Sequence, residues 1–183
     1  ILAGMALTAI LNAGISFISL LDTDVVAVYN YFSVGGLFGV TAKSLIIPAG
    51  LIFLSLGAAL LLSPKISLLC LGDSLASSLG VRVRLLRMVC LICASASAAA
   101  VVSFAGLLGF VGLIVPHIAR KLSGGGMTKT LVLASMVGAT VVMLADTLGR
   151  TLFAPTEIPV GIVMALIGAP FFLVLLLRRR EHA

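Results

Sequence analysis

The chain has 183 residues, of which 61% are hydrophobic and only 10% are charged, and its net charge is +6. Soluble domains usually have about a quarter of their residues charged, so this composition excludes an ordinary soluble domain. It predicts an all-α polytopic membrane protein instead. The basic residues lie in short connections and near the C-terminus, as they do in membrane proteins, so the positive charge does not indicate a nucleic-acid partner.

The first predicted membrane helix covers residues 1–21. The chain starts at Ile1 without the basic region or the cleavage site of a signal peptide, and we interpret it as a fragment of a longer protein. Further apolar segments of about 20 residues, enough to span a bilayer, follow along the chain. They cover residues 45–63, 86–106, 130–149 and 159–177, and a shorter apolar piece covers residues 107–119.

The loop at residues 64–87 contains the stretch LGDSLASSLGVRVR. Leu75, Ala76 and Leu79 repeat at helical spacing with serines between them, and Gly72 and Gly80 bracket the repeat as start and stop signals. We predict a short helix in a cytoplasmic loop. It either rests on the membrane surface or offers Leu75 and Leu79 to the groove of a cytosolic partner.

The segment 86–106 carries Cys90 and Cys93 in C-x-x-C spacing, which is also found at redox and zinc sites. The two cysteines lie in an apolar run with no second pair nearby, so we interpret them as small residues for helix packing. The sequence therefore predicts no metal site here.

The stretch GFVGLIVPHIARKL, residues 109–122, predicts a short, broken or tilted crossing. Gly109 and Gly112 share a helix face and would let a neighbour approach closely, and Pro116 interrupts the helix. His117 is interpreted as a packing residue, since the only other histidine is His182 near the C-terminus. We expect no metal ligands, no catalytic constellation and no cofactor bound by this chain.

Charge decides the topology. If residues 107–119 cross, ten of the 12 basic residues share one side of the membrane, and only Lys43 and Arg150 lie on the other. The positive-inside rule then predicts about six crossings, with the C-terminus and the start of the chain in the cytoplasm. The shared residues are Lys65, Arg82, Arg84, Arg87, Arg120, Lys121, Lys129, Arg178, Arg179 and Arg180.

The fifth predicted crossing, residues 130–149, has ADTLGR at its end, where Asp146 and Arg150 are four residues apart and can pair along one helix face. Arg150 is nearly alone as a positive charge on the outer side, and a lone guanidinium suits a carboxylate of a partner. In the last segment, Gly161 and Gly168 predict tight helix packing, and Pro170 predicts a kink.

Four stretches, in this order and spacing, resemble the FecCD family of ABC-importer permeases: LGDSLASSLGVRV, GFVGLIVPHIARKL, LADTLGR and EIPVGIVMALIGAPFFLVLLL. The resemblance is strong over residues 70–178. It implies a ten-helix permease fold of which residues 1–183 form a single transmembrane domain with helices five to ten. It departs at Gly149, where alanine is common in the family, and we expect that change to be mild.

The resemblance also implies roles. Residues 71–81, including Gly72, Asp73, Gly80 and Val81, would form paired short helices that dock into a cytosolic ABC ATPase. Arg150 would meet a glutamate of an extracytoplasmic substrate-binding protein.

The implied function is a non-catalytic, multi-pass permease subunit in the cell membrane, which imports an iron-siderophore or a related chelate by alternating access. It would form a homo- or heterodimer with a second permease subunit. Cobalamin and haem are alternative substrates. A secondary transporter is the alternative mechanism, but the sequence has almost none of the mid-membrane polar groups that such proteins use.

Overall fold

The structure is a computed structural model that describes residues 2–152 and 157–180, and within these ranges every regular element is a helix. The elements are α1 (Leu2–Leu21), α2 (Thr23–Val34), α3 (Ala42–Leu69), α4 (Asp73–Ser78), α5 (Val83–Ala105), α6 (Val111–Ser123), α7 (Met127–Thr151) and α8 (Val160–Arg180). The predicted all-helical membrane fold is therefore confirmed.

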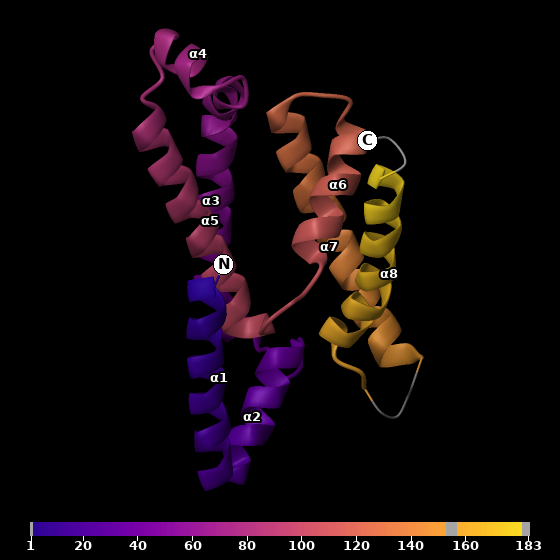
Figure 1. The fold of residues 1–183 in the computed structure, drawn as a ribbon. Coiled ribbons are helices and arrows are strands. Elements are labelled where there is room, and N and C mark those ends of the chain that lie inside the picture. Colours follow the sequence, from indigo (N-terminus) through magenta and orange to yellow (C-terminus); the bar gives the residue numbers. More distant parts are fainter. Residues whose placement is uncertain (1, 153–156, 181–183) are drawn as a thin grey trace.

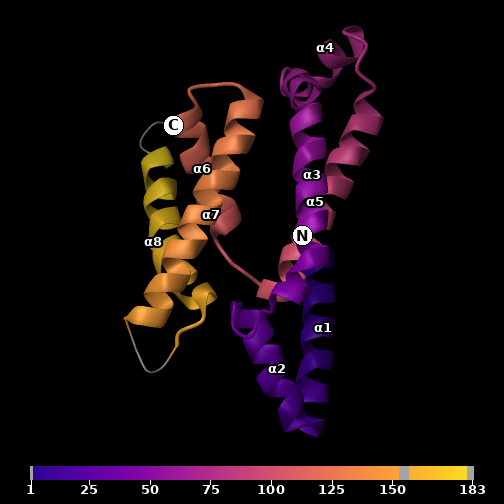
Figure 2. The same cartoon turned by 180° about the vertical axis from the view of Figure 1, so that it is seen from behind.

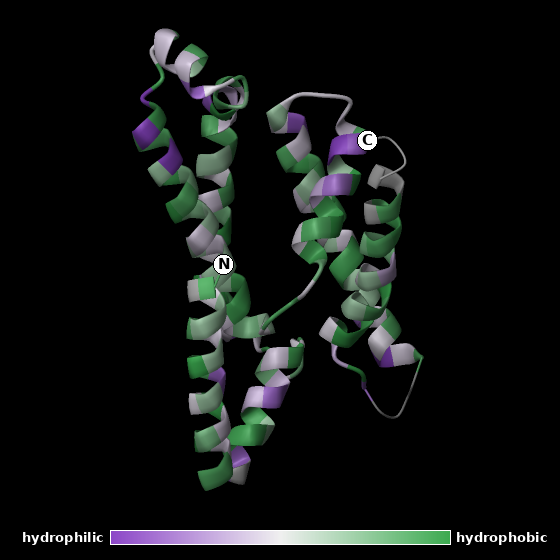
Figure 3. Cartoon of the chain, in the orientation of Figure 1, coloured by the Kyte–Doolittle hydropathy of each residue, from purple (hydrophilic) through white to green (hydrophobic). Residues whose placement is uncertain are grey.

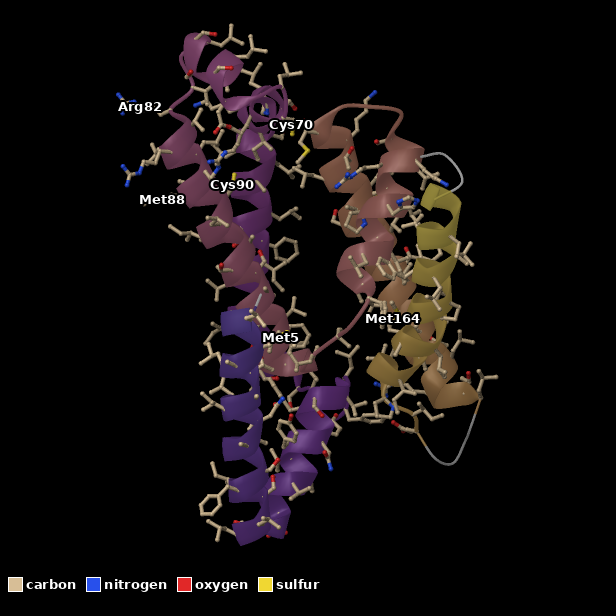
Figure 4. All side chains as sticks on the ribbon, viewed as in Figure 1. Met5, Cys70, Arg82, Met88, Cys90 and Met164 are labelled. Carbon is tan, nitrogen blue, oxygen red and sulfur yellow. The ribbon has the colours of Figure 1, made fainter. Side chains whose placement is uncertain are left out.

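The helices are arranged in groups along a common direction (Figures 1 and 2). α3 and α5 lie side by side with the short α4 at one end, while α6, α7 and α8 pack against one another. α3 also contacts α7 and so joins the two groups. The buried cluster lies within the second group, where Met164 of α8 is enclosed (Figure 4). Its members are Ile114, Ala145, Val160 and Met164.

Four helices, α1, α3, α5 and α7, are long and apolar enough to cross a membrane. The apolar part of α8 covers Val160–Leu175. α6 has 13 residues and is only about 20 Å long. This is shorter than the hydrocarbon core of about 30 Å, and the non-helical residues 106–110 precede the helix. This geometry supports the predicted broken crossing.

The structure brings together the loops that were predicted to share one side of the membrane. α4, the connection between α6 and α7, and the end of α8 lie at the same end of the molecule, which we call the basic end (Figure 1). Hydrophilic residues gather there on the first turns of α5 and the last turns of α6 (Figure 3). The start of α1 was expected at this end too, but it lies level with the lower part of α5, because α1 packs mainly against α2.

Three element boundaries differ from the sequence-based prediction. α2 was not predicted, and it begins with Asp22, whose side chain accepts a hydrogen bond from the N–H of Asp24 at 2.9 Å. α3 runs from Ala42 to Leu69 rather than over residues 45–63, so the loop predicted at 64–87 is limited to residues 70–82. α8 ends at Arg180 rather than at residue 177, and Pro170 lies inside it.

A serine explains how α3 passes Pro64. Proline has no N–H, so the carbonyl four residues earlier, that of Leu60, loses its helical partner. The Ser63 hydroxyl donates a hydrogen bond to this carbonyl at 2.7 Å and lies 2.6 Å from the Thr128 hydroxyl of α7. Since the Ser63 proton is engaged by Leu60, Thr128 is the donor between the two hydroxyls. Ser63 thus repairs α3 and links it to α7.

We expect Ser63→Ala to destabilise the full-length permease by about 1 kcal/mol, because it removes an interhelical hydrogen bond and leaves the Leu60 carbonyl without a partner. Thr128→Val should have the smaller effect, because the bond from Ser63 to Leu60 remains. Thermal unfolding of the two variants in the same detergent measures the difference. Equal midpoints for Ser63→Ala and the unchanged protein would contradict this role.

Candidate functional site

The short helix α4 is bounded by glycines in conformations that other residues rarely adopt. Gly72 precedes it with φ of 118°, and Gly80 follows it with φ of 80°. After the helix, Gly80 donates to the carbonyl of Ser77 at 3.0 Å, and Val81 donates to that of Ala76 at 3.0 Å. This pair of bonds is a Schellman motif, which ends a helix at a glycine with positive φ. The predicted start and stop signals therefore bound this helix.

One part of the implied arrangement is wrong. The resemblance implied paired short helices over residues 71–81, but the structure has the single helix Asp73–Ser78. The Schellman motif ends α4 at Gly80, and α5 begins only at Val83. Too few residues remain between these points for another helical turn.

α4 turns one side inward and the other outward. Ala76 is fully buried, whereas Leu75 and Leu79 are 55% and 62% exposed. Exposed leucines at the hydrophilic end of a membrane protein form a surface that a partner can cover. Ala76, one of the residues implied in ATPase coupling, seats the helix on the protein and cannot itself touch a partner.

An ion pair holds α4 against α5. Nη2 of Arg87 donates to both carboxylate oxygens of Asp73, at 3.0 Å each. Both side chains are more than half exposed, so the pair contributes little free energy, on the order of a few tenths of a kcal/mol. Its effect is positional, since it links the first turn of α4 to the second turn of α5.

Arg150 lies near the end of α7, opposite the basic end. Its Nε donates to Oδ2 of Asp146 at 2.8 Å, its Nη1 lies 3.8 Å from Oε2 of Glu157, and its Cζ stands 5.3 Å from the ring centroid of Phe38. The predicted pair with Asp146 is confirmed. Glu157 and the ring of Phe38 are neighbours of Arg150 that the sequence did not indicate.

The loop before α3 brings Phe38 to this position. The Tyr31 hydroxyl accepts a hydrogen bond from the N–H of Phe38 at 3.0 Å and donates to its carbonyl at 3.2 Å. The Arg150 side chain stays 41% exposed. The cluster of Arg150, Asp146, Glu157 and Phe38, which we call the outer arginine cluster, thus presents an oriented guanidinium at the surface.

Gly149 allows the segment after α7 to pack closely. Ile158 donates its N–H to the carbonyl of Gly149 at 3.1 Å, and a Cβ atom at Gly149 would lie 2.5 Å from the Ile158 carbonyl oxygen. Alanine would force the two segments apart in this chain. The difference from the family pattern, expected to be mild, is therefore structurally significant here.

The segments that follow α2 and α5 bond to each other through their backbones. Gly36 donates its N–H to the carbonyl of Ala105 at 2.9 Å, and Leu107 donates to that of Phe32 at 3.0 Å. Backbone that leaves helical geometry inside a membrane protein needs partners of this kind, because lipid offers none.

Gly35, Gly106 and Gly161 make this approach possible, and we call them the glycine crossing. Gly161, at the start of α8, donates to the carbonyl of Gly35 at 3.1 Å, and a Cβ atom on it would overlap the carbonyl of Val34. A Cβ atom at Gly106 would lie 2.5 Å from the carbonyl oxygen of Phe32. Gly35 and Gly106 also have φ of 75° and 67°, a region that favours glycine.

The predicted packing glycines differ in their surroundings. Gly168 lies against Phe110, the N-cap of α6, which has a left-handed φ of 63°. By contrast, a Cβ atom at Gly109 or Gly112 would meet no atom of the described residues within 4 Å. Gly109 also precedes α6, which begins at Val111, so the predicted helix face shared by the two glycines is wrong. Pro116 lies inside α6 without ending it.

The remaining candidates lie in packed positions. The His117 ring meets Phe171 edge-on at 6.1 Å between centroids, which supports its interpretation as a packing residue. Cys90 and Cys93 are half-buried on α5 and line a groove that faces α3 and α7. His182 lies outside the described residues.

Comparisons with known proteins agree on one family. The model of the FecCD transport family matches residues 1–178. The Fe(3+)-citrate import system permease protein YfmE of Bacillus subtilis is 37% identical over 96% of this chain and 53% of its own length. The hemin transport system permease protein HmuU of Yersinia pestis is 36% identical over 100% of this chain and 55% of its own.

A solved structure is also similar. It is an inward-facing conformation of an ABC transporter assigned to the metal-chelate type, with a TM-score of 0.86 and 33% identity. The match covers 96% of this chain and 59% of the other. The chain thus spans about half the length of the curated relatives it matches.

We expect Gly161→Ala to destabilise the full-length permease by about 3 kcal/mol, because the new methyl group meets backbone, which cannot turn aside as a side chain can. Gly138→Ala on α7 is the matched control. Its Cβ would meet only Val115 side-chain atoms, at 3.5 Å and beyond, which is ordinary contact. Folded yield and thermal unfolding in detergent measure both variants. Similar losses for the two would contradict the importance of the glycine crossing.

Proposed function

The chain belongs to the FecCD transport family, and from this premise we propose that it is the C-terminal part of a permease subunit, helices five to ten of ten, in an ATP-driven importer. The observation that carries the proposal is α4, a helix at the basic end that is fixed on one side and offers Leu75 and Leu79 on the other. A permease needs such an element, since it receives the work of ATP hydrolysis through a contact.

The sidedness of the proposal rests on charge. α4, the α6–α7 connection and the end of α8 share the basic end, and the positive-inside rule places such an end in the cytoplasm. The chain is then a multi-pass protein of the cell membrane with a cytoplasmic C-terminus. The outer arginine cluster faces the opposite compartment, where a substrate-binding protein delivers its cargo.

α4 is the proposed contact for a cytosolic ABC ATPase. Its leucines would enter a groove of the ATPase, and the Asp73–Arg87 pair together with buried Ala76 would pass the movement on to α5. ATP binding can shift the permease between its inward- and outward-facing states only if the ATP-bound ATPase has a higher affinity for one of these states than for the other. This chain itself would carry no hydrolytic residue and no cofactor.

The outer arginine cluster is the proposed contact for the binding protein. Asp146 and Glu157 orient the guanidinium of Arg150 from within this protein, and its exposed side remains available to a carboxylate of the binding protein. Bidentate pairing of arginine with a carboxylate gives such a contact a defined geometry.

The proposed cargo is an iron-siderophore or a related metal chelate, because relatives are named for Fe(3+)-citrate, hemin and achromobactin. Haem and cobalamin remain the alternative cargoes. Since the chain spans about half the length of these relatives, the pathway needs the rest of the permease and a second permease subunit, identical or different.

We expect Leu75→Asp/Leu79→Asp in the full-length transporter to reduce chelate uptake at least tenfold while the permease still folds, because charges replace the apolar surface offered to the ATPase. Leu122→Asp, which changes another exposed leucine at the basic end, is the control and should transport normally. Uptake of labelled iron chelates and ATPase stimulation in proteoliposomes measure the effect.

Unchanged uptake in the double variant would reject α4 as the coupling element. A separate labelling experiment tests the sidedness. A cysteine placed at Ser77, which is exposed, should react with an impermeant reagent only after the cells are opened. Reaction in intact cells would put α4 on the wrong side of the membrane.

We expect Arg150→Glu to weaken capture of the loaded binding protein about tenfold at low salt, or about 1.4 kcal/mol. Lys43→Glu, at the other basic residue of this side, is the charge-matched control, and Arg150→Lys should give an intermediate loss because it keeps the charge without the fork. Binding to the transporter in nanodiscs measures all three. Equal losses for Arg150→Glu and Lys43→Glu would indicate only general electrostatics.

A further inference from the structure

A groove of about 450 Å³ lies between α3 and α5 beneath α4. Most of its lining is aliphatic: Leu62, Leu68, Leu79, Leu85, Leu86 and Val89. Leu86 is buried at the bottom of the groove, whereas Leu85 and Leu79 are exposed along its edge. An aliphatic channel of this kind accepts a hydrocarbon chain without unpaired polar groups.

Two cations complete the lining of the groove, Lys65 from α3 and Arg82 from the segment before α5. Both are exposed, and within the described residues neither forms an ion pair. Arg87, one helical turn further along α5, is instead neutralised by Asp73. The groove therefore combines an apolar floor with two uncompensated positive charges.

The groove lies at the level where a membrane changes from hydrocarbon to headgroups. α3 has 28 residues and is about 42 Å long, which exceeds the hydrocarbon core of about 30 Å. Lys65 stands one turn before the end of α3, so its ammonium group reaches the headgroup region. Arg82 lies on the side of the α3–α5 pair that is turned away from α6, α7 and α8 (Figure 4).

We propose that this groove binds an anionic phospholipid of the cytoplasmic leaflet. Lys65 and Arg82 bind its phosphate, and one acyl chain lies along Leu62, Leu86 and Val89. Two cations around one phosphate favour a headgroup without its own ammonium group, so phosphatidylglycerol should bind better than phosphatidylcholine. This assignment rests on the cytoplasmic placement of the basic end proposed above.

The position gives the lipid a way to act on coupling. Leu79, Gly80 and Val81 line the same groove, and they form the turn that ends α4. A bound lipid therefore touches the element proposed to contact the ATPase. It would support the turn from below while the leucines of α4 meet their partner.

The test uses the full-length transporter with its ATPase, purified in a mild detergent and incubated with phosphatidylglycerol or phosphatidylcholine. Native mass spectrometry counts the lipids retained. We expect Lys65→Gln/Arg82→Gln to lower phosphatidylglycerol retention about tenfold. Arg84→Gln/Lys129→Gln removes the same charge from the basic end outside this groove, and it should lower retention less than twofold. Lys65→Arg/Arg82→Lys keeps both positive charges and should retain phosphatidylglycerol as the unchanged protein does.

Three results would overturn the proposal. The two charge-matched double variants could lose phosphatidylglycerol equally, or the unchanged complex could retain phosphatidylcholine as well as phosphatidylglycerol. In the third, Lys65→Gln/Arg82→Gln would lose the ATPase subunit but keep its lipid. The last result would identify the groove as part of the ATPase contact. Because retention is counted on the purified complex, it does not depend on transport. Failure of the lipid site can therefore be distinguished from failure of the coupling or uptake proposals.

Discussion

The structure depends on satisfying backbone groups where helices end inside a membrane protein. α2 and α5 both end where their last backbone groups need partners within the protein, and the start of α8 meets them there. The three segments solve this by bonding to one another, from Gly36 to Ala105 and from Gly161 to Gly35. Backbones can come this close only without side chains, so the glycine crossing is a requirement of the hydrogen bonds.

The crossing also determines what lies on either side of it. Because α5 ends there, the non-helical residues 106–109 lead from it to Phe110, the N-cap of α6, whose backbone lies in the left-handed region. The short length of α6 thus follows from the place where α5 has to stop. Gly168 on α8 leaves space for the Phe110 ring, so the unusual backbone at the start of α6 is held by packing from the same helix that begins at the crossing.

Local features could be predicted from the sequence, and long-range ones could not. The bounding glycines of α4 and the Asp146–Arg150 pair depend on spacings of a few residues, and both were predicted. α2 was missed, since its 12 residues include polar side chains and its C-terminal end is held by residues far along the chain. Nothing local indicates that Gly35, Gly106 and Gly161 meet. The continuation of α3 beyond Pro64 could not be predicted either, because it depends on the Ser63 hydroxyl, which bonds to the Leu60 carbonyl in place of the N–H that proline lacks.

This organisation gives the proposed coupling a physical route. α4 is linked to the second turn of α5 by Asp73 and Arg87, and the last turn of α5 bonds to the segment after α2. A helix of 23 residues is about 35 Å long and changes length very little, so a displacement of α4 has to appear at the glycine crossing. There it meets α8 through the bond between Gly161 and Gly35. On the proposed function, a movement that the ATPase imposes on α4 at the basic end would therefore reach the start of α8. This start lies close in sequence to Glu157, a member of the outer arginine cluster.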